Sequence, residues 1–244
     1  MKGVILAAGK GTRLLPVTKV LNKSLVLVYD KPLIYYPIQT LKDSGVNEIL
    51  IIARPGHGGQ FLDLLGSGKD LGVKLTYDVQ EEALGIAHGL AIAEDFADGG
   101  KIAFILADNI FEDTFTGTVR KFDAEGHGAV NAITKVSDPE RSGVVEMQNG
   151  KVMSIEEKPK FPKSNLISCG FYLFDNQVFD IIRTLKPSQR GEYEISDLLK
   201  AYLARDKLST IEVKGKWIDA GTFDSLLEAN IYSAKKRRGK KTSK

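Results

Sequence analysis

Short apolar runs recur along the first half of the chain, and stretches with helical character separate them. The runs are rich in Val, Ile and Leu, and they lie at residues 4–8, 48–53, 73–77 and 101–106. Runs this short and this apolar are typical of β-strands buried on both faces. The segments between them predict helices over residues 33–44, 59–65 and 86–96. This alternation predicts a mainly parallel sheet with helices on both faces.

The pattern changes after residue 126, where predicted strands follow one another directly. They lie at residues 129–134, 144–147, 151–155 and 168–174, and Asn149-Gly150 between two of them predicts a tight hairpin. Helices are predicted again over residues 177–185, 195–205 and 222–233. We therefore expect one domain over residues 1–234, a three-layer α/β/α sandwich around a mostly parallel, Rossmann-like sheet. The second half would extend this sheet and supply one wall of a cleft.

The charged residues are unevenly distributed along the chain. The net charge is +3, but seven of the 34 basic residues lie among the last ten positions. Without those ten the body has 27 basic and 31 acidic residues, a net charge of −4, which argues against a body that binds nucleic acid. Clustered like charges repel, so residues 235–244 are predicted to form a disordered basic tail. Electrostatic contact between this tail and nucleic acid or another polyanion is the alternative.

Several classes of protein are excluded by what the sequence lacks. No apolar run approaches the roughly 18 residues of a membrane-spanning helix, and the apolar run at residues 4–8 is too short for a signal-peptide core. The single cysteine, Cys169, excludes an internal disulfide and a zinc site made of cysteines. We therefore expect a cytoplasmic protein that does not enter a membrane.

A glycine-rich turn, AAGKGTRL at residues 7–14, follows the first predicted strand. Glycines at such a position allow backbone N–H groups to close on an anion. The turn is not the dinucleotide fingerprint, because Leu14 stands where G-x-G-x-x-G needs glycine, and the Walker A spacing is absent. With Lys10, Arg13, Lys19 and Lys23 nearby, it indicates a phosphate loop of another type. An ordinary tight turn that needs glycine is the alternative.

Residues 3–32, GVILAAGKGTRLLPVTKVLNKSLVLVYDKP, closely resemble the N-terminal signature of the sugar nucleotidylyltransferases, above all the glucose-1-phosphate thymidylyltransferases. The resemblance continues in order through residues 79–87, 107–111, 138–146, 156–159, 190–192 and 217–222. It implies a Mg²⁺-dependent transfer of a nucleotidyl group from dTTP to α-D-glucose 1-phosphate, which gives dTDP-glucose and pyrophosphate. It also implies a nucleotide-binding part over about residues 1–126, a sugar-binding part over about 127–234, and a homo-oligomer.

In such a reaction two polyanions must meet, so catalysis depends on positioning and on cationic stabilisation. The resemblance implies that Arg13 and Lys23 hold the triphosphate, and that Lys158 neutralises and aims the sugar phosphate. Asp108 follows the strand at residues 101–106, at the carboxyl edge where open α/β sheets bind ligands, and a carboxylate beside phosphates suits Mg²⁺. By the resemblance Asp219 shares this metal. A cap or turn role is the alternative for both aspartates.

The remaining site residues are also carried over by the resemblance. The nucleotide-binding set is Ala8, Gly9, Gly11, Thr12, Arg13, Lys23, Gln80, Gly85 and Asn109. The sugar-phosphate set is Gly143, Glu157, Lys158, Ser168, Cys169 and Arg190. The amide of Gln80 can both donate and accept a hydrogen bond, as the edge of a pyrimidine requires. For Gln80 the alternative is a surface glutamine at the end of a strand. For Glu157 it is a solvated charge within a run of charged residues.

Two departures from the family pattern concern base selection. Leu84 and His88 stand where Gly and Gln are commoner around the base-binding segment, so UTP in place of dTTP remains open, as does another sugar 1-phosphate. A catalytically idle sensor that binds a nucleotide sugar is a second alternative, against which the retained charged residues argue. The three histidines, His57, His88 and His127, look unpaired, and none is assigned a catalytic role.

Overall fold

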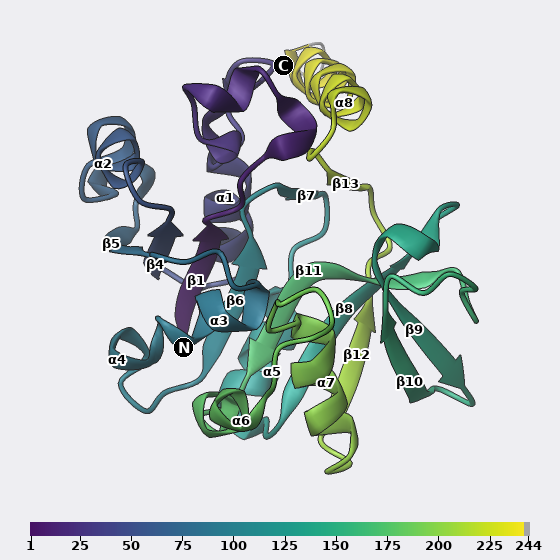
Figure 1. Cartoon of the computed structure of the whole chain (residues 1–244). Coiled ribbons are helices and arrows are strands. Elements are labelled where there is room, and N and C mark those ends of the chain that lie inside the picture. The colour runs from purple at the N-terminus through teal and green to yellow at the C-terminus, as the bar shows by residue number, and fades with distance from the viewer. Residues whose placement is uncertain (242–244) are drawn as a thin grey trace.

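The centre of the protein is a twisted sheet of nine strands (Figure 1). The computed structural model describes residues 1–241, and their side chains through residue 239. The strand order is β10-β9-β11-β6-β1-β4-β5, with β8 beside β11 and β12 beside β8. The strands of this sheet are β1 (Lys2–Ala7), β4 (Glu48–Ala53), β5 (Lys74–Val79), β6 (Ile102–Leu106), β8 (Ala129–Lys135), β9 (Gly143–Gln148), β10 (Lys151–Glu157), β11 (Leu166–Phe174) and β12 (Leu208–Glu212).

Two small ladders lie outside this sheet. One pairs β2 (Leu27–Val28) with β3 (Lys31–Pro32), and the other pairs β7 (Asn109–Phe111) with β13 (Trp217–Asp219). The helices are α1 (Tyr35–Asp43), α2 (Gly58–Leu65), α3 (Ile86–Ala91), α4 (Glu94–Ala97), α5 (Thr116–Glu125), α6 (Val178–Thr184), α7 (Ile195–Leu203) and α8 (Phe223–Lys241). Short 3-10 turns cover Thr12–Leu14, Val17–Lys19, Lys23–Leu25, Lys69–Leu71 and Pro139–Arg141.

The first half of the sheet is parallel, as the alternation of apolar runs and helices predicts. β1 pairs in parallel with β4 and β6, and β4 pairs in parallel with β5. Successive side chains of β1, β4 and β6 point to opposite faces, and both faces are buried. In β1, for example, Ile5 packs under α1 and α2, whereas Val4 packs on the side of α3. The continuous apolar character of these three strands follows from this double burial. The run predicted at residues 73–77 differs, because β5 lies at the edge of the sheet and Lys74, Thr76 and Asp78 are exposed.

The second half adds mainly antiparallel strands, of which β9 and β10 are joined by a tight turn, whereas β12 pairs in parallel with β8. β11 runs antiparallel to β6, β8 and β9, and β9 forms a hairpin with β10. At the hairpin turn Asn149 and Gly150 have φ angles of 50° and 77°, the left-handed pair that the Asn-Gly sequence predicts. Of the predicted elements, the helix expected over residues 86–96 is divided into α3 and α4.

Two apolar clusters, one on each face of the sheet, give the molecule its three layers. One face is covered by α1, α2 and α5, and the other by α3, α4, α6 and α7. This arrangement confirms the predicted α/β/α sandwich. A third, smaller cluster joins the β2–β3 and β7–β13 ladders to the root of α8 through Val28, Leu33, Ile110, Ile218 and Ala229.

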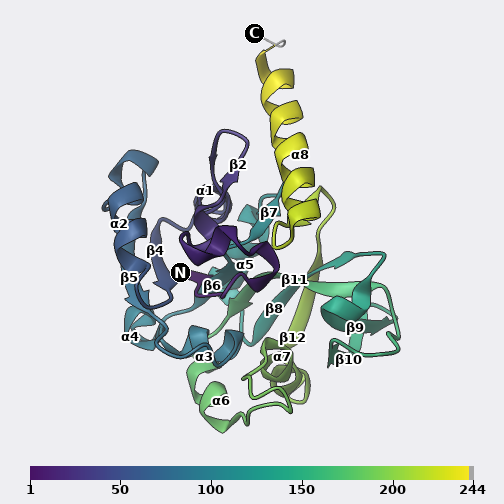
Figure 2. The ribbon, with the colours of Figure 1, turned by 45° about the horizontal axis from the view of Figure 1, so that its top comes forward.

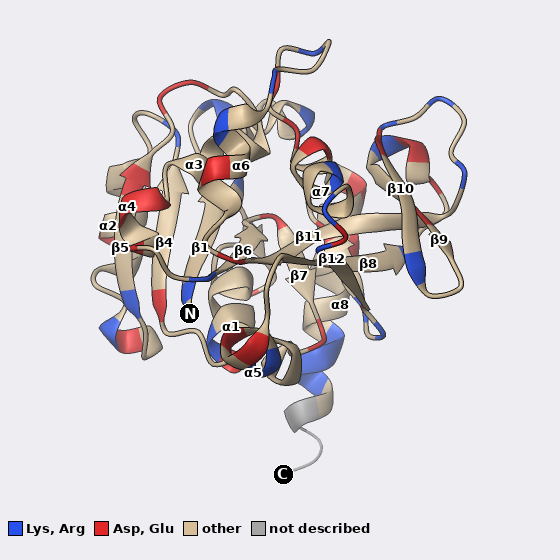
Figure 3. Ribbon diagram, turned by 90° about the horizontal axis from the view of Figure 1, so that it is seen from below, with Lys and Arg blue, Asp and Glu red and all other residues tan. Residues whose placement is uncertain are grey.

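The helix α8 continues to Lys241, so the prediction of a disordered tail is wrong for residues 235–241. It projects from the body, with its basic residues along the distal turns (Figures 2 and 3). Two of the basic residues are paired with acidic ones: Lys236 lies 3.4 Å from Glu112, and Arg237 pairs with Asp30. Residues 242–244 of the predicted tail lie outside the described residues. Within residues 1–241 no helix is both long and apolar enough to cross a membrane.

Candidate active site

A cleft of about 850 Å³ opens at the carboxyl edge of β6, between the two halves of the chain. Its lining comes from β6 and β7, from the region of β9 to β11, and from β13 and the first turns of α8. Nine of the residues that the sequence predicts for the site line this cleft: Arg13, Asp108, Asn109, Gly143, Glu157, Lys158, Ser168, Cys169 and Asp219. The ligand site expected at this edge of the sheet therefore coincides with a real cavity.

The glycine-rich loop leaves β1 at Ala7 and is held by buried polar side chains. The Thr18 hydroxyl donates to the Gly11 carbonyl at 2.7 Å, and the Asn22 amide donates to the Ala7 carbonyl at 2.9 Å. Gly11 has a φ of 64°, and a Cβ there would lie 2.8 Å from a methyl carbon of Thr18. Because no other residue fits this conformation and this space, glycine is required here. The loop that includes Ala8, Gly9 and Thr12 is thereby fixed at the end of β1.

Asp108 forms an ion pair with Lys23 where β6 gives way to β7. The Lys23 ammonium bonds one carboxylate oxygen of Asp108, and the Asn109 amide donates to the other at 2.9 Å. Burial raises the pKa of Asp108, but the charge and hydrogen bond of Lys23 outweigh burial and hold this pKa below its usual value. Asp108 is therefore a carboxylate at neutral pH, and the sequence-predicted residues Lys23, Asp108 and Asn109 are brought together.

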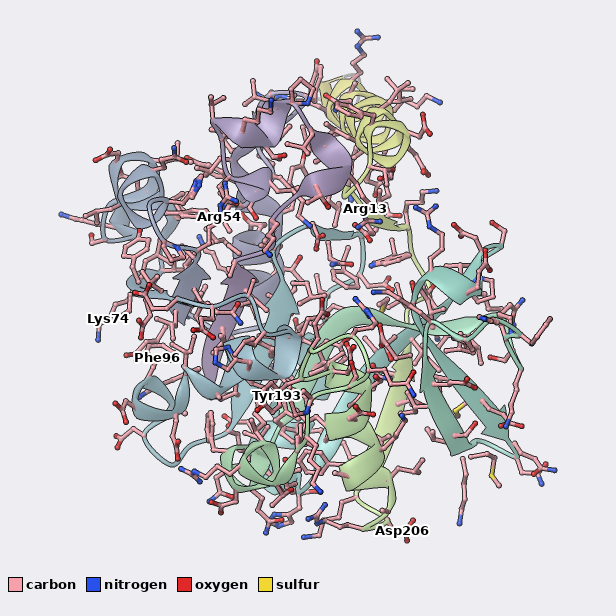
Figure 4. All side chains as sticks on the ribbon, in the orientation of Figure 1. Arg13, Arg54, Lys74, Phe96, Tyr193 and Asp206 are labelled. Atoms are coloured by element: carbon pink, nitrogen blue, oxygen red, sulfur yellow. The ribbon has the colours of Figure 1, made fainter. Side chains whose placement is uncertain are left out.

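Asp219 lies beside this pair because β13 pairs with β7. In that ladder Asp219 is the register partner of Asn109, and the Ala220 amide donates to the Asp108 carbonyl at 2.9 Å. Arg13 approaches Asp219 at 3.7 Å, near the root of α8 (Figure 4). Burial and the negative charge of Asp108 raise the pKa of Asp219 to about 6. The two aspartates that the resemblance pairs are thus neighbours in space.

The residues around this carboxylate pair fit a hard divalent cation. One oxygen of Asp219 is buried without a hydrogen-bond partner, and the neighbouring charge of Asp108 makes its ionised form costly. A bound cation would satisfy this oxygen of Asp219 and offset the repulsion between the two carboxylates, and Mg²⁺ prefers carboxylate and phosphate oxygens. Within the described part of the chain no cluster of three or more acidic, His or Cys side chains could hold a metal.

A second group of charged residues lies on β10 and the loops beside it. The Lys158 ammonium lies 3.5 Å from the Glu157 carboxylate, and Lys158 has a left-handed φ of 45°. Its backbone N–H donates to the Ser142 carbonyl at 3.0 Å. Gly143 leaves room for Glu157, because a Cβ at residue 143 would lie 3.3 Å from one oxygen of that carboxylate. Of the predicted sugar-side residues, Gly143 and Lys158 therefore lie at the Glu157 carboxylate.

Arg190 is not part of the cleft lining, but it belongs to the same cluster. Its guanidinium lies 3.7 Å from Glu157, 3.1 Å from Glu192 and 3.4 Å from Glu194. Burial raises the pKa of Glu194, although Ser188 and Arg190 stabilise its charged form. Arg190 is thus shared among three carboxylates, which leaves Lys158 as the more available of these two cations.

Gln80 and Gly85 form a further group, next to the cleft rather than in its lining. The Gln80 amide donates to the Gly85 carbonyl at 3.1 Å, and its nitrogen lies 3.0 Å from Nδ1 of His88. The prediction that the histidines are unpaired is therefore wrong for His88, and also for His57, whose Nδ1 lies 3.2 Å from Gln60 Oε1. Gly85 has a φ of 105°, and a Cβ there would lie 2.6 Å from the Tyr193 carbonyl oxygen, so glycine is required.

Sequence reasoning misses several residues of the cleft. Trp217 donates from its indole N–H to the Asn109 side chain at 2.7 Å and to the Cys169 carbonyl at 2.9 Å. It therefore connects β7 with β11 in the lining of the cleft. Asp138 and Arg141 form an ion pair at 3.2 Å and also line the cleft. All three lie in segments that carry the family resemblance, which is the signal for them. Asp224 and Glu228 of α8 line the cleft without any such signal.

A model of one protein family matches almost the whole chain. The family model for nucleotidyl transferases matches residues 2–236, so the chain belongs to the nucleotidyl transferase family. Among its relatives are glucose-1-phosphate thymidylyltransferases. The one from Neisseria gonorrhoeae is 46% identical over 237 residues, which cover 95% of this chain and 82% of the relative. The one from Mycobacterium tuberculosis is 42% identical over 250 residues, which cover 100% of this chain and 86% of the relative.

Solved structures show the same likeness in three dimensions. A Bacillus anthracis protein in complex with sucrose, provisionally identified as a glucose-1-phosphate thymidylyltransferase, is 46% identical and has a TM-score of 0.91 over 95% of this chain and 94% of that chain. A UDP-glucose pyrophosphorylase complexed with UDP-glucose is 25% identical and has a TM-score of 0.84 over 96% of this chain and 98% of that chain. Both therefore share the fold over almost the whole chain.

Proposed function

We propose that this protein is an enzyme that transfers a thymidylyl group from dTTP to α-D-glucose 1-phosphate, giving dTDP-glucose and pyrophosphate, with Mg²⁺. The observation that carries the proposal is the arrangement of four charged side chains at the carboxyl edge of the sheet. Lys23 pairs with Asp108, and Arg13 approaches Asp219, in the cleft that also receives Lys158. Relatives at 42–46% identity that are named for this reaction support it.

In the proposed reaction a phosphate oxygen of the sugar 1-phosphate forms a bond to the α-phosphorus of the triphosphate. The bond between this phosphorus and the bridging oxygen to the β-phosphate breaks, and pyrophosphate leaves with that electron pair. Negative charge grows on the leaving group, so fixed cations and N–H donors near it lower the barrier. The loop at residues 8–13 and the side chains of Arg13 and Lys23 are the groups proposed for this role.

Asp108 and Asp219 are proposed to hold the Mg²⁺ together with oxygens of the triphosphate. When bound, this ion neutralises phosphate charge and polarises the phosphoryl group that is transferred. The partnerless oxygen of Asp219 supports this assignment. In the same assignment Lys23 keeps Asp108 ionised, and Asn109 orients its carboxylate.

On the sugar side, Lys158 is proposed to bind and aim the attacking phosphate. Glu157 would accept hydrogen bonds from hydroxyl groups of the hexose, with Gly143, Ser168 and Cys169 forming the adjoining surface and Arg190 holding Glu157 in place. Because Arg190 is engaged by three carboxylates, it is proposed as a support for the site rather than as a direct ligand of the phosphate.

UTP is a second candidate for the nucleotide substrate. The solved UDP-glucose pyrophosphorylase shares this fold with a TM-score of 0.84, and Leu84 and His88 flank the proposed base-reading residues. An idle binding protein is the other alternative, but such a protein has little use for the full set of charged residues around the phosphates.

The proposed function is tested by pyrophosphate release with Mg²⁺. The assay covers dTTP, UTP, CTP, GTP and ATP against the 1-phosphates of glucose, galactose, mannose and N-acetylglucosamine. We expect the highest kcat/KM for dTTP with glucose 1-phosphate. A UTP preference would reassign the nucleotide. No turnover with any pair, together with tight binding of a nucleotide sugar, would favour the idle binding protein.

Two further properties are proposed with the function. A homo-oligomer and a cytoplasmic location are both typical of the enzyme class that the sequence resembles. Light scattering after size-exclusion chromatography measures the first, because it gives the mass of the particle for comparison with the 26.7 kDa of one chain.

A further inference from the structure

The Gln80 side chain is buried at the end of β5, and its amide nitrogen lies within hydrogen-bond distance of two groups. The nitrogen lies 3.1 Å from the Gly85 carbonyl oxygen and 3.0 Å from Nδ1 of His88. Only 4% of the residue is exposed. Among the described residues no group donates a hydrogen bond to Oε1, so this oxygen is the free polar group of the side chain.

The chemistry of the neighbours fixes the orientation of this amide. A backbone carbonyl can only accept, so the amide atom facing Gly85 must be the nitrogen. The opposite orientation would place two acceptor oxygens 3.1 Å apart. Because the second amide hydrogen points to His88, Nδ1 of that ring must be the unprotonated nitrogen, and its ring proton lies on Nε2.

The His88 ring is itself held in place from a different part of the chain. Tyr193 stacks on it with ring centroids 6.2 Å apart and an interplanar angle of 28°. Tyr193 also clamps the backbone before α3, since its N–H donates to the Leu84 carbonyl at 2.7 Å and its carbonyl accepts from Ala87 at 3.1 Å. Figure 4 shows Tyr193 beside α3. The ring that accepts from Gln80 is therefore fixed by packing and by backbone hydrogen bonds.

We propose that His88 is a positioning residue that holds the Gln80 amide with Oε1 as its only free group, so that the site selects bases with an N–H at position 3 of a pyrimidine ring. Thymine and uracil carry such a donor, whereas N3 of cytosine is an acceptor and would face the oxygen unfavourably. This inference rests on the proposed function in one respect only, namely that Gln80 meets the base. It predicts discrimination against cytosine, with similar effects on dTTP and UTP.

The test compares two substitutions of His88. His88→Leu fills a similar volume but removes the acceptor, whereas His88→Asn keeps an acceptor, because its Oδ1 occupies the position of Nδ1. For His88→Leu we expect the KM for dTTP and UTP to rise about fivefold, as for the loss of one hydrogen bond. We expect kcat and the KM for glucose 1-phosphate to stay within about twofold, and the preference for dTTP over CTP to fall.

The asparagine variant and a distant histidine provide the controls. His88→Asn is expected to restore the KM for dTTP to within about twofold of the parent value. His57→Leu, which removes a ring whose Nδ1 lies 3.2 Å from Gln60 Oε1 at the start of α2, is expected to leave the preference unchanged. An unchanged KM in His88→Leu, or the same defect in both His88 variants, would overturn the inference.

A spectroscopic measurement remains decisive if His88→Leu does not fold or if no triphosphate is turned over. Nitrogen-15 spectra of the folded parent protein, labelled in its three histidines, report the protonated ring nitrogen of each. The His88 signal, assigned by its absence in His88→Asn, is expected to show an unprotonated Nδ1. A proton on Nδ1 would overturn the inference. Failure of turnover alone would instead count against the proposed function, and calorimetry with dTDP, UDP and CDP would still measure the discrimination between bases.

Discussion

Asp108 and Asp219 are adjacent carboxyl groups with opposite tendencies to ionise. Lys23 holds the pKa of Asp108 low, whereas burial and the charge of Asp108 raise the pKa of Asp219 to about 6. Without a cation, the ionised form of Asp219 therefore opposes folding. Such a group is suited to binding a metal ion, because the ion removes a cost that the folded protein otherwise carries.

We predict that Asp219→Asn stabilises the metal-free protein while it abolishes Mg²⁺-dependent turnover. Two pKa units correspond to about 3 kcal/mol, but the side chain is 38% exposed, so we expect a gain of about 1 kcal/mol at pH 8. As the pH falls from about 6 to about 4, Asp219 becomes protonated in the folded protein before it does in the unfolded one. The unfavourable charge is thereby removed, and the free energies of unfolding of the parent and the variant become equal. Thermal unfolding in a chelator at several pH values measures the difference.

Mg²⁺ provides the control for this prediction. Addition of the ion with dTTP should stabilise the parent protein more than the Asn variant, because only the parent has both carboxylates. A variant that is less stable than the parent at pH 8, or one that keeps normal turnover, would remove Asp219 from the proposed metal site.

A second prediction concerns the two sides of the cleft. Lys158→Ala is expected to raise the KM for glucose 1-phosphate at least tenfold and to change the KM for dTTP by less than about threefold, because the charge removed is the one proposed to bind the sugar phosphate. Lys163→Ala is a matched control on the same loop, since Lys163 is exposed and lies 3.7 Å from Glu146. Steady-state kinetics with each substrate varied in turn distinguishes the two effects. A defect confined to dTTP would contradict the assignment.

For single residues, the sequence predicts which side chains belong to the site better than it predicts which side chains contact one another. The resemblance places Asp108, Asp219, Lys23 and Lys158 in the site, and the structure puts all four on or beside one cleft. The contact of Gln80 with His88 is not predictable, because it depends on how β5 and α3 pack rather than on their spacing along the chain. The indole hydrogen bonds of Trp217 are missed for the same reason.

Among the elements, the turn before β8 shows how closely backbone segments approach in this fold. Gly128 has a φ of 87°, its N–H donates to the buried Asp175 carboxylate at 2.6 Å, and a Cβ at this position would lie 2.1 Å from the Lys207 carbonyl oxygen. This turn sets the start of β8 against the segment that leads into β12. Strand pairing in the second half of the sheet therefore depends on a residue without a side chain.

We predict that Gly128→Ala destabilises the protein by about 3 kcal/mol, through the left-handed backbone and the clash together. Gly99→Ala is the matched control, because Gly99 has a φ of 68° but nothing lies within 4 Å of its added Cβ. Its cost is expected to be about 1 kcal/mol, from the backbone conformation alone. Urea unfolding gives both values, and equal losses in the two variants would show that the contact with Lys207 relaxes.

The elements that the sequence predicts are those with strong apolar periodicity. β1, β4 and β6 are found within a few residues of their predicted bounds because both of their faces are buried. β12 escapes prediction because its sequence, LSTIE, is half exposed and alternates weakly. α8 runs beyond its predicted end because ion pairs with Glu112 and Asp30, distant in the sequence, neutralise part of the basic segment.

Over the whole molecule, charge is divided between an acidic body and a basic helix end. The body without residues 235–244 has a net charge of −4, and the complete chain has +3. The cations that the proposed reaction needs are therefore local to the cleft rather than part of a general positive surface. The C-terminal end of α8, where these basic residues lie, projects from the body (Figures 2 and 3).

We predict that removal of residues 235–244 preserves turnover and lowers the free energy of unfolding by no more than about 1 kcal/mol. The deleted contacts with Glu112 and Asp30 are largely exposed ion pairs, which contribute little in water. Kinetics, urea unfolding and retention on a heparin column measure the three relevant properties. The shortened protein should lose any affinity for heparin, whereas a loss of turnover would place the helix end in the catalytic machinery.

The reactivity of Cys169 can report how often the wall of the cleft opens. It is the only thiol in the chain, it lies in the cleft wall with 1% of its surface exposed, and burial raises the pKa of its thiol. A thiol reagent can therefore attack a single sulfur, and only during moments when this wall opens. The rate of labelling therefore measures how often the wall opens. A molecule that fills the cleft will slow the labelling in proportion to its occupancy, so its binding can be followed without a dye or an engineered cysteine.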